Sequence, residues 1–275
     1  MNTALKALQL KARQQVYTLL SGHSLSKLHG EGYDFSQLRE YQMGDDIRKI
    51  NWTITAKLGK PYIKELHANR ELSVVVCALM DGSLYFGSGN DKQKKLTEVA
   101  SILGYAAQQN TDLFTGLAYI HNQTFTTPPT KQLYHIEQFS KILFETPLLG
   151  TIVNKQHTIE NLFKRVYKPS LIFVLGDFLD EIDLSLLAQK HEVIAIIIRD
   201  RKEEVVKVLG EVTLTNPQDN TRMETYFGKS SVYNYRKKLM KSDEKQEEHF
   251  RRYGIRSVKI FTDEEALTKL MTLFI

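Results

Sequence analysis

Hydrophobic and polar positions follow two alternating patterns along most of the chain. Nearly continuous β-branched and apolar runs predict strands buried on both faces over Leu72–Met80, Ser170–Gly176 and Glu192–Arg199. Helices are predicted over Asp91–Gln109, 131–145, 158–167, Asp183–Lys190, Ser230–Arg252 and Asp263–Leu273. Further strands are expected over Thr111–His121, Gln123–Thr127 and Ser257–Phe261, and a hairpin over Glu211–Thr215 and Thr221–Phe227. Strands regularly separated by helices predict an α/β fold with an open, mostly parallel sheet and helices on both faces.

The N-terminal quarter departs from this alternation. An amphipathic helix is predicted over residues 3–20, because Leu5, Leu8, Ala12, Val16 and Leu19 recur at helical spacing. The segment Gly22–Lys64 then matches neither the helix nor the strand period, apart from an extended edge over Pro61–His67. We expect two parts: residues 1–70 with the helix and irregular segment, and residues 71–275 with the sheet.

Aromatic residues argue that the irregular segment is ordered. Disordered segments are depleted in aromatics, whereas this one contains Tyr33, Phe35, Tyr41 and Trp52. We expect Trp52 to insert into the core. Two interpretations remain open for the segment: a polar cap over a sheet edge, or an element that binds a partner.

Composition is that of an ordinary soluble globular protein, with 275 residues, 42% hydrophobic and 25% charged. The longest apolar run, Val193–Ile198, is far shorter than the ~18 residues that cross a bilayer. Lys6, Lys11 and Arg13 interrupt the region where a signal peptide would have its apolar core. The single cysteine, Cys77, lies in an apolar run and is expected to pack in the core. These features predict a cytoplasmic protein.

The positive charge is concentrated near the N-terminus. Residues 1–70 hold 11 Lys/Arg and 6 Asp/Glu, whereas residues 71–275 hold 26 of each. This asymmetry indicates a docking surface for something acidic. Acidic side chains such as Glu31, Glu40 and Asp45 are interleaved with the basic ones and would repel phosphate, so a protein interface is favoured over nucleic acid. For the first helix, we expect the leucine stripe to pack against the domain, and peripheral contact with an anionic membrane surface is the alternative.

Two of the buried strands lead into aspartate. Leu72–Met80 is followed by Asp81-Gly82-Ser83, and Ser170–Gly176 by Asp177. Ligands of open α/β sheets bind outside the carboxyl ends of the strands, so adjacent strands would bring Asp81 and Asp177 into one crevice. Carboxylate and hydroxyl oxygens are ligands that suit Mg²⁺ or Mn²⁺. The alternative is that each aspartate caps the turn that follows it.

Motifs spread over the chain resemble a known family. They are Gly22-His23-Ser24, Gly30-x-Gly32-x-x-Phe35, Leu38-Arg39-Glu40-Tyr41, Gly44-Asp45-Asp46-x-Arg48-x-Ile50-Asn51-Trp52, Ala56-Lys57, the strand ending at Asp81, Asp177-Phe178, and Ile198-Arg199-Asp200 with Glu203. Together they resemble the domain of unknown function family fifty-eight. The resemblance implies a von Willebrand factor A-like domain, commonly encoded beside a MoxR-type AAA+ ATPase. It also implies a non-enzymatic adaptor or co-chaperone role.

The resemblance further implies a metal-ion-dependent adhesion site, in which a partner's carboxylate completes the coordination of the metal. Asp81 and Ser83 match the start of its Asp-x-Ser-x-Ser motif, and Asp177 matches its last acid. Thr158 is our choice for its threonine, with Thr151 as the rival. Tyr85 stands where the motif has its second serine, and a phenol is too long and rigid to replace a short hydroxyl. We therefore expect Mg²⁺ or Mn²⁺ to bind weakly or not at all, in a degenerate site.

Within the irregular segment, Asp45 and Asp46 lie close in sequence to Arg39 and Arg48. Ion pairing inside the segment is the leading structural interpretation, and contact of these residues and Trp52 with a protein partner is the functional one.

An enzymatic alternative is a Mg²⁺-dependent phosphohydrolase, because an aspartate after the first strand is also the nucleophile of haloacid-dehalogenase-like enzymes. Those enzymes use Asp-x-Asp, whereas this chain has Asp81-Gly82-Ser83.

Overall fold

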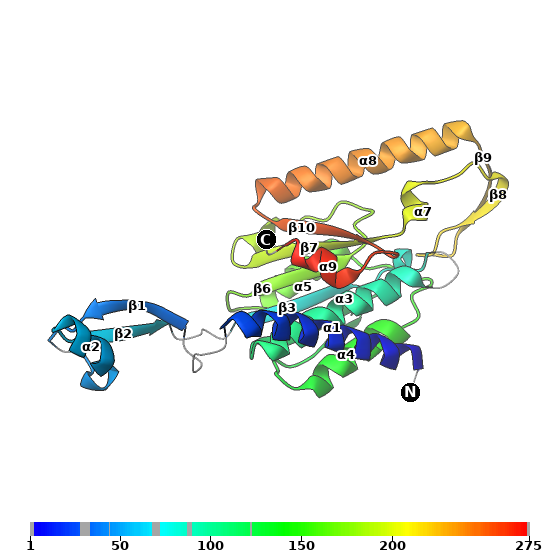
Figure 1. Ribbon diagram of the computed structural model, residues 1–275. Coiled ribbons are helices and arrows are strands. Elements are labelled where there is room, and N and C mark those ends of the chain that lie inside the picture. The colour runs from blue at the N-terminus through cyan, green and yellow to red at the C-terminus, as the bar shows by residue number, and fades with distance from the viewer. Residues whose placement is uncertain are drawn as a thin grey trace. The chain divides into compact units, whose positions relative to one another are not determined.

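The chain forms two compact units (Figure 1). The computed structural model describes residues 3–27, 34–43, 45–67, 72–86, 90–121 and 123–273. One unit comprises Met1–Thr18 and Leu72–Ile275, and the other comprises Leu19–Glu71. Helix α1 (Thr3–Lys27) contributes residues to both. The division at residue 71 lies close to the expected boundary, but the first 18 residues belong with the sheet.

The larger unit is built on a six-stranded sheet with the order β10-β7-β6-β3-β4-β5. Its strands are β3 (Ser73–Leu79), β4 (Leu113–Ile120), β5 (Gln123–Thr126), β6 (Leu171–Gly176), β7 (Glu192–Arg199) and β10 (Arg256–Phe261). Only β5 pairs in the antiparallel sense, with β4, and the other pairs are parallel. The predicted open, mostly parallel sheet is confirmed.

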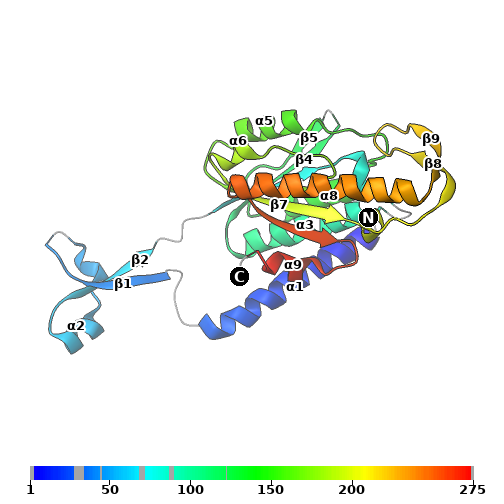
Figure 2. The same ribbon diagram turned by 90° about the horizontal axis from the view of Figure 1, so that it is seen from above.

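Helices cover both faces of this sheet (Figures 1 and 2). The first face carries α1, α3 (Asp91–Gln109), α4 (Leu133–Glu145) and α9 (Ala266–Met271). The second carries α5 (Lys155–Arg165), α6 (Ser185–Ala188) and α8 (Lys229–Arg252). The order of strands and helices follows the sequence prediction, and a further short helix, α7 (Arg201–Glu204), was not predicted.

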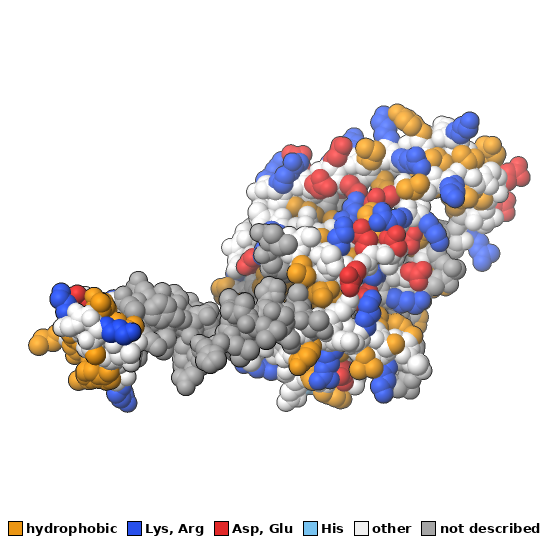
Figure 3. Space-filling view, in the orientation of Figure 1, with side chains coloured by type: hydrophobic (Ala, Val, Ile, Leu, Met, Phe, Trp, Pro, Cys, Tyr) orange, Lys and Arg blue, Asp and Glu red, His pale blue; other side chains and the backbone are white. Residues whose placement is uncertain are grey.

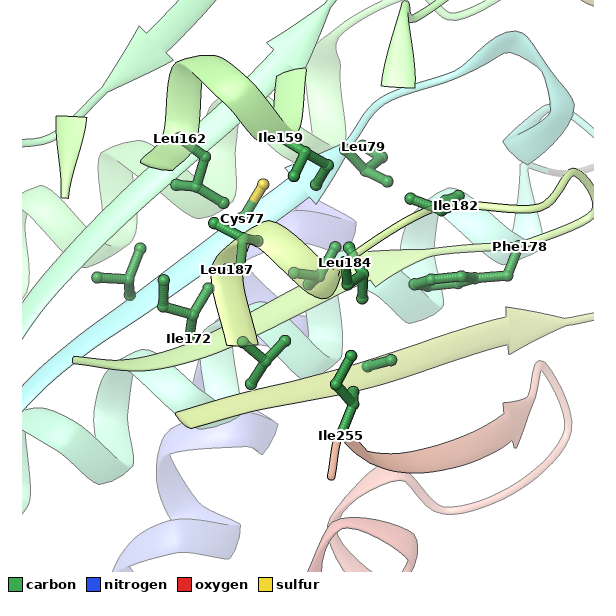
Figure 4. Close-up of a cluster of buried hydrophobic side chains, with 14 of the residues drawn as sticks. Cys77, Leu79, Ile159, Leu162, Ile172, Phe178, Ile182, Leu184, Leu187 and Ile255 are labelled. Atoms are coloured by element: carbon green, nitrogen blue, oxygen red, sulfur yellow. The ribbon is translucent and has the colours of Figure 1, made fainter. Parts of the chain in front are cut away.

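Alternate residues of the central strands point to opposite faces, which gives the sheet two cores. On the second face, Cys77 and Leu79 of β3 join a cluster with Leu162 of α5 and Leu187 of α6 (Figure 4). The Cys77 thiol is buried, and burial raises its pKa. A thiol held protonated in an apolar core is unreactive, which agrees with the expected packing role.

The apolar stripe of α1 is buried in the larger unit. Leu5, Ala12 and Val16 are inaccessible to solvent or nearly so. Lys11 Nζ lies 2.8 Å from Glu98 Oε1 of α3. These contacts confirm that the first helix packs its stripe against the domain.

The smaller unit contains more regular structure than the sequence indicated. Strands β1 (Asp34–Glu40) and β2 (Tyr62–His67) pair in the antiparallel sense, and the 3₁₀ turn η1 (Ile47–Lys49) and helix α2 (Trp52–Leu58) lie between them in the chain. Asn51 caps the start of α2 and Gly59, with a φ of 72°, ends it in the left-handed conformation. Gly30, Gly32, Tyr33 and Gly44 of the family motifs lie outside the described residues.

A second two-stranded sheet extends from the larger unit. Strands β8 (Gly210–Thr215) and β9 (Arg222–Phe227) form the predicted hairpin. Its tip, Asn216–Asn220, returns to the carboxyl edge of the main sheet, as the contacts below show.

Candidate functional site

The carboxyl ends of β3 and β6 form the centre of the candidate site. The two strands are neighbours in parallel register, with Ala78 opposite Leu175. Asp81 and Asp177 therefore emerge at the same edge of the sheet. The strand order also reverses at this point, because β4 pairs with one side of β3 and β6 pairs with the other. Such switch points are where open α/β sheets bind ligands.

Both carboxylate oxygens of Asp81 accept hydrogen bonds from within the chain. Asp81 is buried and caps the short 3₁₀ turn η2 (Gly82–Leu84). Its Oδ1 accepts from Ser83 N at 3.3 Å and from Gln218 Nε2 at 2.7 Å, and its Oδ2 accepts from Val153 N at 3.4 Å. The capping alternative for this aspartate is therefore realised, together with a long-range contact.

The tip of the β8–β9 hairpin packs directly on the turn after Asp81. A Cβ atom at Gly82 would lie 2.5 Å from Pro217 O and 2.8 Å from Thr151 O, which only glycine avoids. Gly150 N donates to Pro217 O at 2.8 Å. The close approach explains why glycine is needed at position 82, and it holds Gln218 against Asp81.

Asp177 faces a buried ammonium group. Its Oδ2 accepts from Lys92 Nζ at 3.3 Å, and its Oδ1 accepts from Leu179 N at 3.4 Å. Burial alone would raise the pKa of the Asp177 carboxyl, but Lys92, Ser83, Lys155 and Arg199 together hold that pKa below its usual range. Asp177 is therefore ionised at neutral pH.

Lys92 also bonds a second carboxylate, Glu203. Lys92 lies in the first turn of α3 with 0% of its side chain exposed, and its Nζ is 2.5 Å from Glu203 Oε1. Glu203 Oε2 accepts from Asp200 N at 3.0 Å and thereby completes a capping box on α7. Burial raises the pKa of Glu203, and the nearby Asp177 charge raises it further against the lowering by Lys92. We call Lys92, Asp177 and Glu203 the buried triad.

The backbone that carries Asp177 is fixed by Arg199 of β7. The fully buried Arg199 donates from Nε to Asp177 O at 2.6 Å and from Nη2 to Phe178 O at 3.0 Å. Phe178 has a φ of 49°, which is rare for a bulky residue. Its ring packs against Phe250 of α8, with 5.9 Å between the ring centroids. These contacts hold the strained turn and so set the direction of the Asp177 side chain.

The other residues predicted for a metal site, or standing at its motif positions, differ in burial and in the groups they contact; they are Ser83, Thr151, Thr158 and Tyr85. Ser83 Oγ is buried, and its side chain lies near enough to the Asp177 carboxylate for their interaction to lower the pKa of Asp177. Thr151 adjoins the Asp81 turn, because its carbonyl accepts from Gly82 N at 2.9 Å. Thr158 was expected before a helix but lies buried inside α5, which begins at Lys155. Tyr85 is partly exposed.

These groups fit a divalent cation poorly. Both oxygens of Asp81 already accept N–H donors, and Asp177 accepts from an ammonium group. A cation placed on Asp177 would lie beside the like charge of Lys92, which disfavours it. No cluster of three or more His, Cys, Asp or Glu side chains with metal-binding geometry occurs among the residues described in the structure.

In the smaller unit, the expected ion pairs are present. Arg39 holds Asp45 with two bonds of 2.8 Å, from Nη1 to Oδ2 and from Nη2 to Oδ1. Arg48 contacts Asp46 from Nε at 3.1 Å and from Nη2 at 3.0 Å. The Arg39–Asp45 pair is half-buried and the Arg48–Asp46 pair is mostly exposed. The predicted structural role of these four residues is confirmed.

The expectation that Trp52 inserts into the core is wrong. Trp52 is the first residue of α2 and is 65% exposed. A unit of about 50 residues buries too little surface to enclose every large apolar side chain, and Ile63 is the one we find buried where side chains are described in this unit. Trp52 therefore presents an aromatic surface to solvent.

Four residues of the site were not singled out as functional from the sequence. Lys92 precedes Gln93, Lys94 and Lys95, and such a polar first turn is typical of a solvated helix start. Arg199 and Glu203 were noted only as part of the family motifs. Gln218 is 137 residues from Asp81, and no local pattern predicts that contact.

Fold and site together define an open α/β-sheet protein with a buried charge cluster at the carboxyl edge of its central strands. The chain belongs to the family described as Protein of unknown function DUF58, whose model matches residues 37–249.

Related sequences and structures are distant. The chain is 25% identical over 228 residues to Uncharacterized protein Rv1480 of Mycobacterium tuberculosis and to Uncharacterized protein Mb1516 of Mycobacterium bovis, covering 80% of this chain and 72% of each relative. It is also similar to conserved hypothetical protein BatB from Bacteroides thetaiotaomicron, with a TM-score of 0.40 and 10% identity over 74% of this chain and 96% of that one. It is likewise similar to the SpRpn10 VWA domain, with a TM-score of 0.35 and 10% identity, over 73% of this chain and 94% of that one.

None of the described helices combines the length and hydrophobicity required to span a membrane.

Proposed function

We propose that this protein is a non-enzymatic adaptor that binds another protein through its smaller unit, and that the partner is a MoxR-type AAA+ ATPase. The proposal rests chiefly on the exposed apolar surface of that unit. Met43, Ile47, Trp52 and Leu58 are all exposed there, and hydrophobic side chains are visible on this part of the molecule in Figure 3. We call these four residues the apolar surface.

Several large apolar side chains on one small unit are a feature of interaction sites. Monomeric proteins rarely leave large contiguous apolar patches in water, and tryptophan is among the residues that contribute most to binding energy. Three of the four residues lie on short helices, Ile47 on η1 and Trp52 and Leu58 on α2. The bidentate Arg39–Asp45 pair holds the chain leading to η1. A preformed surface loses less conformational entropy when a partner binds.

The choice of partner rests on the resemblance of the motifs to the family. The Arg48 side chain is 90% exposed and that of Asp46 38% exposed, and both flank Ile47 in the chain; a polar rim is typical of protein interfaces. We place Arg39 and Asp45 in a shaping role and Arg48, Asp46 and Trp52 in direct contact with the partner.

The phosphohydrolase alternative gains no support from the site. A nucleophilic carboxylate must reach its substrate, whereas Asp81 is 3% exposed and bonded to the hairpin tip.

Binding of the purified full chain to a purified MoxR-type ATPase from the same genome tests the proposal. Trp52→Ala removes the largest apolar contact and is expected to weaken binding by at least about tenfold. Tyr167→Ala is the matched control, because Tyr167 is comparably exposed on the larger unit. If the unmodified protein does not bind, the ATPase is not its partner. If Trp52→Ala binds as tightly as the unmodified protein, the apolar surface is not the binding site.

A further inference from the structure

The buried triad places a positive charge where the resemblance led us to expect a metal ion. The Lys92 ammonium lies between Asp177 Oδ2 at 3.3 Å and Glu203 Oε1 at 2.5 Å, and the ring centroid of Phe86 is 5.5 Å away. An ammonium group that is fully removed from water is strongly unfavourable unless carboxylates compensate its charge. Both carboxylates of the triad are themselves buried, so the three groups depend on one another.

The elements around the triad hold Lys92 firmly. Lys92 is anchored in α3, whereas Asp177 follows β6 and is fixed through Arg199. Glu203 is fixed by the capping box of α7. The cation is thus part of the folded chain and cannot leave it as a bound ion can.

The Asp81 carboxylate is satisfied by a second group of the chain. In a metal-ion-dependent adhesion site, the metal is the positive group that binds the first aspartate. Here the Gln218 amide donates to Asp81 Oδ1 at 2.7 Å. The amide supplies N–H donors and needs no cation to approach a carboxylate. The contact is reinforced by the packing of Pro217 on Gly82.

We propose that the Lys92 ammonium takes the place of the divalent cation and that the Gln218 amide satisfies the Asp81 carboxylate, so that this edge is complete without metal. The carboxyl edge is then a structural centre of the domain, whose carboxylates are bonded by donors of the chain itself. This inference does not depend on the adaptor proposal, which concerns the other unit.

Metal titration is the direct test of whether this edge is complete without an added ion. Mg²⁺ and Mn²⁺ are titrated into the full chain by calorimetry, and free Mn²⁺ is followed by electron paramagnetic resonance. We expect no saturable binding at millimolar metal. A saturable site that is abolished by Asp177→Ala would overturn the proposal.

Lys92→Met removes the ammonium while keeping an unbranched side chain of similar length. If the ammonium occupies the cation's place, the variant is expected to bind Mn²⁺ about tenfold or more tightly than the unmodified protein. Lys94→Met is the matched control, since Lys94 lies on the same turn but is about half exposed. A folded Lys92→Met protein that binds no more Mn²⁺ than the control would also overturn the proposal.

Gln218→Glu gives a second test that leaves the buried triad intact. It places a carboxylate against Asp81 at the hairpin tip, so the melting temperature is expected to fall further than in Gln218→Ala, which removes the amide without adding charge. Because Lys92 still holds the cation's place in both variants, added Mg²⁺ or Mn²⁺ is expected to restore neither. Recovery of Gln218→Glu by metal would overturn the proposal, even where Lys92→Met does not fold.

Discussion

At the scale of single residues, several buried carboxylates of the larger unit have cationic partners. Besides the triad, Glu98 of α3 is nearly inaccessible and accepts from Lys11 Nζ at 2.8 Å and from Lys95 Nζ at 2.7 Å. Burial would raise the pKa of Glu98, but the bonds from the two lysines hold it below its usual range. This carboxylate joins the N-terminal helix to the sheet domain.

Glu98→Gln is expected to change how stability depends on pH. The unfolded carboxyl takes up its proton near pH 4.5 and the folded one at lower pH. The contribution of Glu98 is therefore full above pH 4.5 and is lost as pH falls through the lowered folded-state pKa. Thermal melts between pH 7 and pH 3 should show the variant less stable at neutral pH, with the difference narrowing in acid. A stability difference that stays constant across this pH range would show that ionisation of Glu98 does not contribute to stability.

Some residues of the site could be predicted from the sequence and others could not. Asp81 and Asp177 were found because each directly follows an apolar run, and strand ends converge in parallel sheets. Lys92 was missed because three lysines occupy one helical turn, and only the position of α3 in the fold decides that Lys92 and Lys95 are buried and Lys94 is not. Trp52 was placed in the core because aromatics usually are, whereas the small size of its unit leaves it exposed.

At the scale of elements, the β8–β9 hairpin is an insertion that completes the edge of the main sheet. Its strands are largely exposed, and its tip contacts Gly82, Gly150 and Asp81. The hairpin itself was predictable from a turn-rich pentamer between two alternating stretches. Its docking was not, because that depends on shape complementarity between distant segments.

Gly82→Ala is expected to displace the hairpin tip. The added Cβ would overlap Pro217 O and Thr151 O, and such overpacking typically costs about 1–3 kcal/mol. Hydrogen exchange should become faster at Gly150, whose N–H bonds Pro217 O. Gly176→Ala is the control, since a Cβ there meets Leu79 at an ordinary 3.4 Å. Unchanged exchange at Gly150 would argue against displacement.

Helix α2 in the smaller unit depends on its cap. The Asn51 side chain accepts from Ile54 N at 3.3 Å, and replacing such a cap by alanine typically costs about 1 kcal/mol. We expect Asn51→Ala to speed hydrogen exchange of the amides in α2. Thr53→Ala, an exposed change inside the same helix, should leave those rates nearly unaltered, and similar rates in both variants would refute the capping role.

At the scale of the whole molecule, the larger unit needs the first helix of the chain. Leu5 is 2% exposed whereas Leu10, one and a half turns further along, is 57% exposed. Leu5→Ala is therefore expected to lower the free energy of unfolding by about 2–5 kcal/mol. Leu10→Ala should change it by less than about 0.5 kcal/mol. Denaturant unfolding of both variants measures the contrast, and equal effects would show that α1 does not stabilise the domain.

The global fold was largely predictable because its strands are long apolar runs and its helices have clear periodicity. The division of the chain into two units was harder to predict from the sequence. Residues 1–18 and 72–275 combine across an intervening segment. The apolar stripe predicts that the first helix packs against a folded domain, but it does not show where the unit boundary falls within that helix. Within that segment, β1 was missed and α2 was not anticipated, because short elements bounded by Gly and Asp residues lack a full period.

The bond between Gln218 and Asp81 has a consequence for synthesis of the chain. The two residues are 137 positions apart. A nascent chain that has emerged from the ribosome only as far as β7 therefore contains Asp81 but not yet the amide that bonds it. We expect chains truncated before the hairpin to fold incompletely and to be degraded readily by proteases.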